Sequence, residues 1–170
     1  MEKEKYIQIK EIIDKQERML RFDHFSNNDA WELGKFLVEK IAQKQIDLAV
    51  AIRRLNGNII FQYATENTNL NNQNWMQRKF NAVHLMNCSS LNAWATSHIM
   101  GEQVETHGLS TKDYVFCGGG FPIRLKSAEI VAVVTVSNLP HEQDHQFIVE
   151  AISEWLSVEN VPYFEENILL

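Results

Sequence analysis

Two adjacent cations, Arg78 and Lys79, are the residues of this sequence best suited to bind a ligand. They stand near the start of an expected helix, where free backbone N–H groups also favour anions. Gly119 and Gly120 let the backbone approach a ligand closely, because glycine has no side chain, and Arg124 follows four residues later. We therefore expect a small anion near these three cations and the two glycine N–H groups. Solvated charges or salt bridges between subunits are the alternative role for the cations.

The serine pair Ser89-Ser90 stands between two expected helices, shortly after His84. A serine nucleophile requires a general base, an orienting acid and an oxyanion hole. The glycines of a Gly-x-Ser-x-Gly elbow do not flank this pair, which argues against a hydrolase of that type. Capping of the second helix is the favoured interpretation, and both serines remain candidates for the ligand site. No complete catalytic set is recognisable, so the sequence leaves open whether the protein is an enzyme.

Histidines offer a second kind of chemistry. His141 and His145 lie four residues apart on the last expected helix, where both imidazoles share one face. This spacing suits a transition metal or haem iron, but exposed histidines in a first helical turn are also common. His98 and His107, which stand near an expected loop, are alternative ligands. The sequence therefore assigns no metal, and haem is a candidate cofactor without a defined ligand.

The overall composition excludes several classes of function. The chain has 170 residues, of which 45% are hydrophobic and 22% charged, as in a globular domain with its own core. Its net charge of −6 argues against a nucleic-acid partner, because phosphate backbones require a surplus of Lys and Arg. Cys88 and Cys117 lack the spacing of a disulfide framework or a zinc site, which indicates a reducing compartment. With no signal-peptide core and no apolar run that could span a membrane, we expect a single cytoplasmic domain over residues 1–170.

Hydrophobic periodicity locates the elements that must position these residues. Apolar residues at helical spacing predict helices at 2–20, 30–43, 75–85, 91–100 and after Pro140, with Asp29 as the cap of the second. Strands are expected at 47–55, 59–64 and 130–136, and Asn56-Gly57-Asn58 predicts a tight turn between the first two. The asparagine-rich stretch from Thr65 to Asn74 predicts a polar loop.

The strand at 130–136 is apolar on both of its alternating sets of residues. Such a strand is buried on both faces, so we expect it at the centre of a sheet. Hairpin-like strands separated by helices indicate an α+β fold, with one mainly antiparallel sheet and helices on both faces. The apolar tail at 161–170, which ends in Ile168-Leu169-Leu170, needs a surface to pack against, and a neighbouring subunit is the expected candidate.

Five short motifs support a family resemblance. They are Arg78-Lys79, Ser89-Ser90, Gly119-Gly120-Phe121-Pro122-Ile123-Arg124, Val136-Ser137-Asn138-Leu139-Pro140 and Asp144-His145. In combination they resemble uncharacterised protein family 0303, within the wider GlcG/HbpS group that is also called the haem-degrading domain. The resemblance covers nearly the whole chain, including Glu17, Asp29-Ala30 and Leu33-Gly34.

The resemblance implies a profilin-like or PAS-like antiparallel sheet of about five strands with flanking helices, assembled as dimers into larger rings. In the wider group, haem or corrinoid-linked roles attach to some members. The chain departs from the wider pattern at Asn138, which stands in place of a glycine, and at Ala128-Glu129, which replaces a glycine turn. We expect the fold to tolerate both changes.

Three hypotheses about function follow. The first is a homo-oligomeric module, a dimer or a ring of dimers, that binds a small anionic ligand. Its expected binding residues are Arg78, Lys79, Ser89, Ser90, Gly119, Gly120 and Arg124, beside the turn Gly118–Gly120. The second is a haem-binding or haem-degrading protein with one of the histidines as iron ligand. The third is a protein-interaction scaffold that recruits a partner through its acidic surface and apolar tail.

Overall fold

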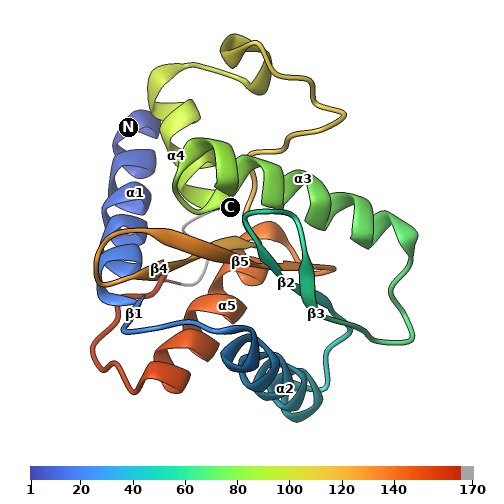
Figure 1. Ribbon diagram of the computed structural model, residues 1–170. Helices are drawn as coiled ribbons and strands as arrows, with labels where there is room; N and C mark the ends of the chain where they lie inside the picture. Colours follow the sequence, from blue (N-terminus) through green and yellow to red (C-terminus); the bar gives the residue numbers. More distant parts are fainter. Residues whose placement is uncertain (166–170) are drawn as a thin grey trace.

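The computed structural model of the chain describes residues 1–165, which are organised around one five-stranded sheet (Figure 1). The helices are α1 (Glu2–Met19), α2 (Asn27–Lys44), α3 (Leu70–Met86), α4 (Ser90–Met100), the short 3-10 helix η1 (Val104–His107) and α5 (His141–Leu156). The strands are β1 (Arg21–Phe22), β2 (Ala49–Arg54), β3 (Ile59–Ala64), β4 (Gly120–Leu125) and β5 (Ile130–Ser137). In Figure 1, α3 and α4 lie above the sheet, α2 and α5 lie below it, and α1 stands beside α4. The expected α+β fold with helices on both faces is confirmed.

The strand order is β1-β4-β5-β2-β3, which places β5 at the centre as predicted. β5 pairs antiparallel with β4 and with β2, and β2 pairs antiparallel with β3. β1 is the exception, because it pairs in parallel with β4. The sheet is therefore mainly antiparallel, as expected, with one parallel pair at its β1 edge. β1 has only two residues, which are too few to show the alternation that identifies a strand.

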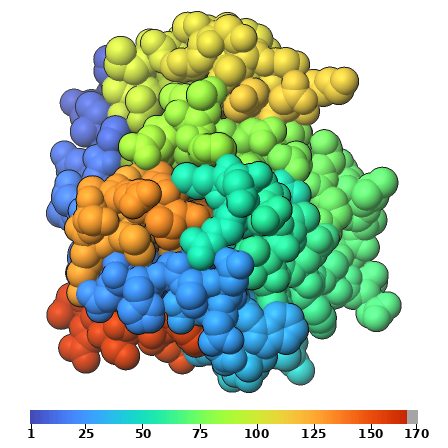
Figure 2. Space-filling model, viewed as in Figure 1, coloured from blue at the N-terminus to red at the C-terminus, as the bar shows by residue number. Residues whose placement is uncertain are grey.

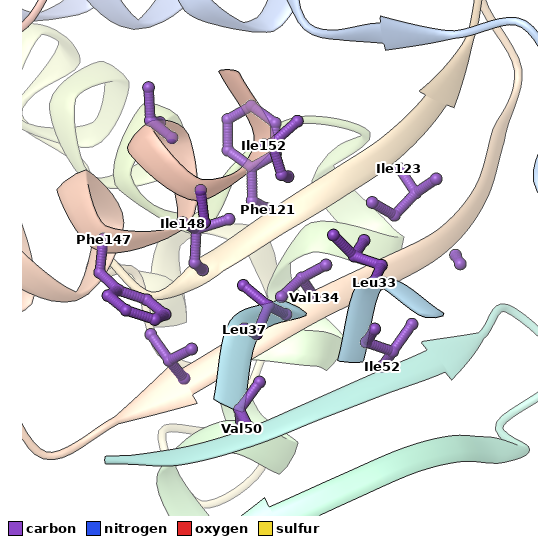
Figure 3. Packing of buried hydrophobic residues seen from close by; sticks show 14 of the residues in the cluster. Leu33, Leu37, Val50, Ile52, Phe121, Ile123, Val134, Phe147, Ile148 and Ile152 are labelled. Carbon is purple, nitrogen blue, oxygen red and sulfur yellow. The ribbon is translucent and has the colours of Figure 1, made fainter. Parts of the chain in front are cut away.

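β5 is buried on both of its faces. Val134 and Val136 point into the core with α2 and α5, whereas Val133 packs with Phe80 and Val83 of α3. The alternation of side chains along a strand requires this division of odd and even positions. Figure 3 shows the α2–α5 side of the core, where side chains of α2 and α5 meet those of β2, β4 and β5. Each fully buried aliphatic side chain in this core contributes about 1.5–3 kcal/mol to folding.

Two helices begin earlier than the sequence analysis indicated. α2 starts after Ser26, whose side chain accepts from the Asp29 N–H, while the Asp29 carboxylate accepts from the Ser26 N–H. The predicted cap Asp29 is thus the third residue of a capping box. α3 starts at Leu70, because Asn69 and Asn72 form a second reciprocal pair. The second half of the expected polar loop is therefore the first turn of α3, and this correction places Asn69, Asn71 and Asn72 near the end of β5.

The β2–β3 hairpin forms part of the surface between α2 and α3 (Figure 2). Its turn contains Gly57 at φ +93°, a value that favours glycine, so the expected Asn-Gly turn is present. Among residues 1–165, no helix is long and apolar enough to cross a membrane.

Part of the apolar tail packs against its own chain. Val161 is 6% exposed in the main core, and Phe164 packs with Ile9 and Ile13 of α1. Gln16 of α1 donates from Nε2 to the Pro162 carbonyl oxygen at 2.8 Å. The last apolar residues of the tail, Ile168-Leu169-Leu170, lie outside the described residues.

Candidate functional site

A cleft of about 520 Å³ lies at the end of the central strand β5, between the first half of α3 and the start of α5. Its lining residues are Asn69, Asn71, Asn72, Trp75, Lys79, Val115, Cys117, Ser137, Asn138, Leu139, His141 and Asp144. We call it the asparagine cleft, because four of these side chains are asparagines. Its volume falls within the range of small-molecule sites.

A buried ion pair lines the asparagine cleft. Lys79 Nζ on α3 donates to Asp144 Oδ2 on α5 and to the Val136 carbonyl oxygen, both at 2.9 Å. Asp144 Oδ1 also accepts from the Leu139 N–H at 3.1 Å. Burial raises the pKa of the Asp144 carboxyl, and Lys79 and the backbone N–H donors oppose this rise. The cation that the sequence assigned to an anion is therefore paired with a carboxylate of its own chain.

The glycine turn before β4 packs tightly against this ion pair. A Cβ atom on Gly119 would lie 2.5 Å from Lys79 Nζ, and Gly119 has φ +117°. A Cβ atom on Gly118 would lie 2.0 Å from the His141 carbonyl oxygen. Glycine is required here because protein segments approach each other closely, rather than because a ligand approaches the backbone.

His141, the first residue of α5, has a fixed tautomer. Its Nδ1 accepts from the Gly118 N–H at 3.1 Å, so the hydrogen of the neutral ring must lie on Nε2. Burial lowers the pKa of His141, and Glu142 acts in the opposite direction. The neutral imidazole therefore offers an N–H donor, and Nε2 has no lone pair for a metal while the bond to Gly118 persists.

The polar wall of the cleft is held by its own hydrogen bonds. Asn72 Nδ2 donates to Ser137 Oγ at 3.2 Å and lies 3.4 Å from Asn138 Oδ1. Asn138 Nδ2 donates to the Asp47 carbonyl oxygen at 3.1 Å. Each amide carries both donors and acceptors, so this wall is suited to a polar ligand of either kind. Cys117 adds no nucleophile, because burial raises the pKa of its thiol.

The aromatic wall of the cleft is Trp75, which Arg78 supports. The Arg78 guanidinium lies 4.6 Å from the centroid of the Trp75 ring, a cation–π geometry. Arg78 Nε also donates to the Thr111 carbonyl oxygen at 3.0 Å, which ties α3 to the segment before β4. Arg78 thus positions a wall of the asparagine cleft from outside it.

Comparisons with known proteins agree with this architecture. The profile of the family described as "Haem degrading protein HbpS-like" matches residues 25–153. The chain belongs to this HbpS-like family. A UPF0303 protein of Yersinia enterocolitica is 33% identical over 147 residues, which cover 84% of this chain and 84% of the relative. The expected resemblance to family 0303 is confirmed.

Two solved structures show the same fold as this HbpS-like chain. The Ybr137w protein has a TM-score of 0.80 and 24% identity, and the match covers 87% of each chain. The PduOC:heme complex has a TM-score of 0.63 and 19% identity, covering 83% of this chain and 99% of that one.

In this HbpS-like chain, the three cations expected at one anion site line three different hollows. Lys79 lines the asparagine cleft, Arg78 lines a hollow beside α4, and Arg124 lines one beside α1. Arg124 donates from its guanidinium to the carbonyl oxygens of Asn87 and Ala128, at 2.8 and 2.9 Å.

The serine pair lies inside the protein. Ser89 Oγ accepts from the Asn92 N–H and caps α4, which confirms the capping prediction. The Ser89 N–H donates to Glu17 Oε1 on α1 at 2.9 Å. Ser90 Oγ accepts from the Gly120 N–H at 2.9 Å. These bonds join α4 to α1 and to β4, and both serines are completely buried.

The remaining candidate histidines differ in access to a ligand. His145 is completely buried, and its Nε2 lies 2.8 Å from Gln16 Oε1. His107 Nε2 lies 3.2 Å from a carboxylate oxygen of Glu102. His98 Nδ1 lies 2.9 Å from the Trp94 carbonyl oxygen and must donate to it, which leaves the lone pair on Nε2.

Sequence reasoning missed the asparagines and Trp75 as site residues, because the stretch around them has no apolar period. The spacing of Asn69 and Asn72 was the available signal for an earlier helix start. A capping side chain followed three residues later by a second polar residue is typical of the first turn of a helix. Because α3 starts at Leu70, both Trp75 and Lys79 lie in its first half. That half of the helix lies beside the end of β5.

Proposed function

We propose that this chain is a small-ligand-binding module whose ligand occupies the asparagine cleft. The observation that carries the proposal is the convergence, in a cleft of about 520 Å³, of amide groups, an aromatic wall and a neutral imidazole donor. Small-molecule sites combine apolar surface with a few fixed polar groups in this way.

The chemistry of the lining favours a polar ligand without net charge. Lys79 and Asp144 are the oppositely charged lining residues and neutralise each other, and His141 is neutral near pH 7. The Asn71 amide offers hydrogen bonds to a ligand, and the Trp75 indole offers a flat ring for stacking. A small compound with an amide-like or hydroxylated ring has the matching chemistry.

Membership of the HbpS-like family supports a ligand-binding role, because the family description refers to haem and a solved structure with the same fold is a complex with haem. The family does not identify which cleft of this chain holds the ligand. That assignment rests on the geometry of the cleft.

The test is a thermal-shift screen of uncharged polar ring compounds, with small carboxylates and phosphate as the anionic arm. Ligand that binds the native state raises the melting temperature. We expect a hit that Trp75→Ala weakens and Trp31→Ala leaves unchanged, because Trp31 lies on α2 outside the cleft. A hit that both variants bind as tightly as the parent chain contradicts the assignment to this cleft.

Haem is the second candidate ligand, and His98 is the observation that favours it. Its Nδ1–H donates to a backbone carbonyl, the arrangement that orients an imidazole whose Nε2 binds a metal. His98 lines a hollow of about 540 Å³ beside α4, together with Trp94, Phe116 and Arg78. The aromatic rings suit a porphyrin face, and Arg78 could pair with a propionate. Haem bound there would supply redox chemistry.

A haemin titration of the purified chain tests this candidate. We expect a saturable Soret band that His98→Ala abolishes and that His84→Ala, a change at an exposed histidine of α3, preserves. Equal spectra for both variants would assign haem to non-specific adsorption.

Self-association and partner recruitment are further proposals. We infer a homo-oligomer from the family resemblance, and the native mass of the purified chain tests it. For the scaffold alternative, deletion of residues 163–170 is expected to remove assembly or the binding of a partner protein. An unchanged mass and unchanged partner binding would restrict the tail to packing on its own chain.

A further inference from the structure

A second hollow, separate from the asparagine cleft, lies where the end of α1 meets β1 and β4. It has a volume of about 310 Å³, and the two hollows share no lining residue. In Figure 1, α1, β1 and β4 come together on the same side of the molecule. We call it the arginine hollow, because Arg18, Arg21 and Arg124 all line it.

Two of these arginines face each other across neighbouring strands. Arg21 of β1 and Arg124 of β4 are register partners in the parallel pair, so their side chains leave the sheet on the same face. Like charges at such positions destabilise a sheet unless something neutralises them. The guanidinium of Arg124 donates to two carbonyl oxygens, which carry no formal charge. Within residues 1–165, neither arginine forms a salt bridge.

Arg21 also has an unused donor. Its Nε is buried and has no hydrogen-bond partner among the described residues. A buried N–H without an acceptor costs free energy, and a charged donor costs more than a neutral one. Arg21 therefore has an N–H group that lacks an acceptor, and it stands beside Arg124, a second arginine without a salt bridge among the described residues.

The acidic residues of the hollow do not remove this excess. Asp14 pairs with Lys10 at 2.8 Å, and Glu17 Oε1 accepts from the Ser89 N–H and from Asn92 Nδ2. Burial raises the pKa of Glu17, and its hydrogen bonds with Ser89 and Asn92 and the charge of Arg124 oppose this rise. Lys10 and the three arginines thus outnumber the two carboxylates, in a chain whose net charge is −6.

We propose that the arginine hollow binds a small dianion of the phosphate type, either inorganic phosphate or a short phosphate monoester. Guanidinium groups donate in pairs to phosphate oxygens, so one phosphoryl group supplies acceptors to both Arg21 and Arg124 and compensates both charges. The volume of about 310 Å³ lies at the lower end of small-molecule sites, which suits a phosphoryl group with few further atoms. This site goes beyond the proposed function, because its ligand and its residues differ from those of the asparagine cleft.

The test measures the melting temperature of the full chain against inorganic phosphate and methyl phosphate, with sodium chloride at matched ionic strength as the control. We expect a saturable rise with a phosphate compound that exceeds the chloride control, because only specific binding to the native state saturates. Tighter binding of methyl phosphate would identify a monoester as the ligand, and tighter binding of inorganic phosphate would identify the free ion.

Arg21→Gln is the decisive variant. It removes a charge and the unpaired Nε while β1 keeps its backbone bonds, and we expect at least about a tenfold loss of phosphate affinity. Arg53→Gln is the matched control, since Arg53 lies on β2 outside both hollows, and it should bind phosphate like the parent chain. Arg124→Lys keeps the charge without the guanidinium fork and should weaken binding as well.

Two results would overturn the proposal. One is a parent chain whose melting temperature responds to phosphate no more than to chloride. The other is an Arg21→Gln variant that folds and binds phosphate as tightly as Arg53→Gln. Neither result bears on the asparagine cleft, whose test uses changes at Trp75.

Discussion

Lys79 Nζ of α3 lies 2.9 Å from Asp144 Oδ2 of α5, and the two side chains are only 3% and 2% exposed. The pair therefore connects the helices on opposite faces of the sheet, at the end of the central strand. A buried ion pair is costly to break, because removal of one partner leaves the other charge without compensation.

We expect Lys79→Met to reduce the free energy of unfolding by about 3–5 kcal/mol, since it leaves Asp144 buried alone. The double variant Lys79→Met/Asp144→Leu should lose less than the sum of the two single changes. Urea unfolding of the four proteins of this cycle measures the coupling. Lys35→Met is the control, because Lys35 pairs with Glu32 on the surface and the change should cost no more than about 1 kcal/mol. Additive losses in the cycle would show that the two charges act independently.

The glycine turn gives a second prediction. Gly119→Ala introduces a Cβ atom 2.5 Å from Lys79 Nζ and 2.7 Å from the Val136 carbonyl oxygen, at φ +117°. Gly57→Ala introduces comparable backbone strain at φ +93°, but no atom lies within 4 Å of its new Cβ. Denaturant unfolding should show a loss of about 1–2 kcal/mol for Gly57→Ala, from backbone strain alone, and a clearly larger loss for Gly119→Ala. Equal losses would mean that the ion pair moves aside freely.

Local patterns predicted the elements of this fold but not the contacts between them. The two-sided apolar run at 130–136 identified the central strand, and Asn56-Gly57 identified the hairpin, because both signals lie within a few residues. The pairing of Lys79 with Asp144 joins residues 65 positions apart, and no periodicity records such a contact. The sequence therefore indicated a charged group at α3 but could not show that its partner was internal.

The same limit applies to the histidines. The four-residue spacing placed His141 and His145 on one face of α5, as a shared metal site requires. In the fold, His141 lines the cleft while His145 is enclosed by Phe121 and Phe164. Helical spacing gives the direction of a side chain on its helix. Its burial depends on the residues that pack over it, and for His145 these residues come from segments distant in the sequence.

The two departures from the wider family pattern lead to a third prediction. Asn138, expected to stand in place of a glycine, and Ala128, in the pair expected to replace a glycine turn, have φ +142° and φ +76°, where L-residues are strained. Ala128→Gly should raise the free energy of unfolding by about 0.5–1 kcal/mol, as relief of strain exceeds the added flexibility of the unfolded chain. Asn138→Gly should gain less, because it loses the hydrogen bond to the Asp47 carbonyl oxygen. Thermal unfolding of both variants measures the difference, and a destabilised Ala128→Gly would contradict the strain argument.

Acid sensitivity is expected from His145. Burial lowers the pKa of His145 to about 3, and the nearby His141 acts in the same direction. His145 Nε2 donates to Gln16 Oε1, while Nδ1 is buried without a partner, so the folded protein holds the neutral ring. The unfolded chain binds a proton near pH 6.5, so stability from this residue is complete above that pH and declines as pH falls toward 3.

When the pH falls from 7 to 5, protonation of His145 in the unfolded chain should reduce the free energy of unfolding by about 2 kcal/mol. His145→Leu removes that pH dependence, although it also leaves Gln16 Oε1 without its donor and so lowers stability at pH 7. Urea unfolding at both pH values separates the two effects, because only the difference between the pH values reports the proton. His84→Leu, at an exposed position of α3, serves as the control and should keep the pH dependence of the parent chain. If His145→Leu lost as much stability on acidification as the parent chain, a different buried group would have to be the one that binds the proton on unfolding.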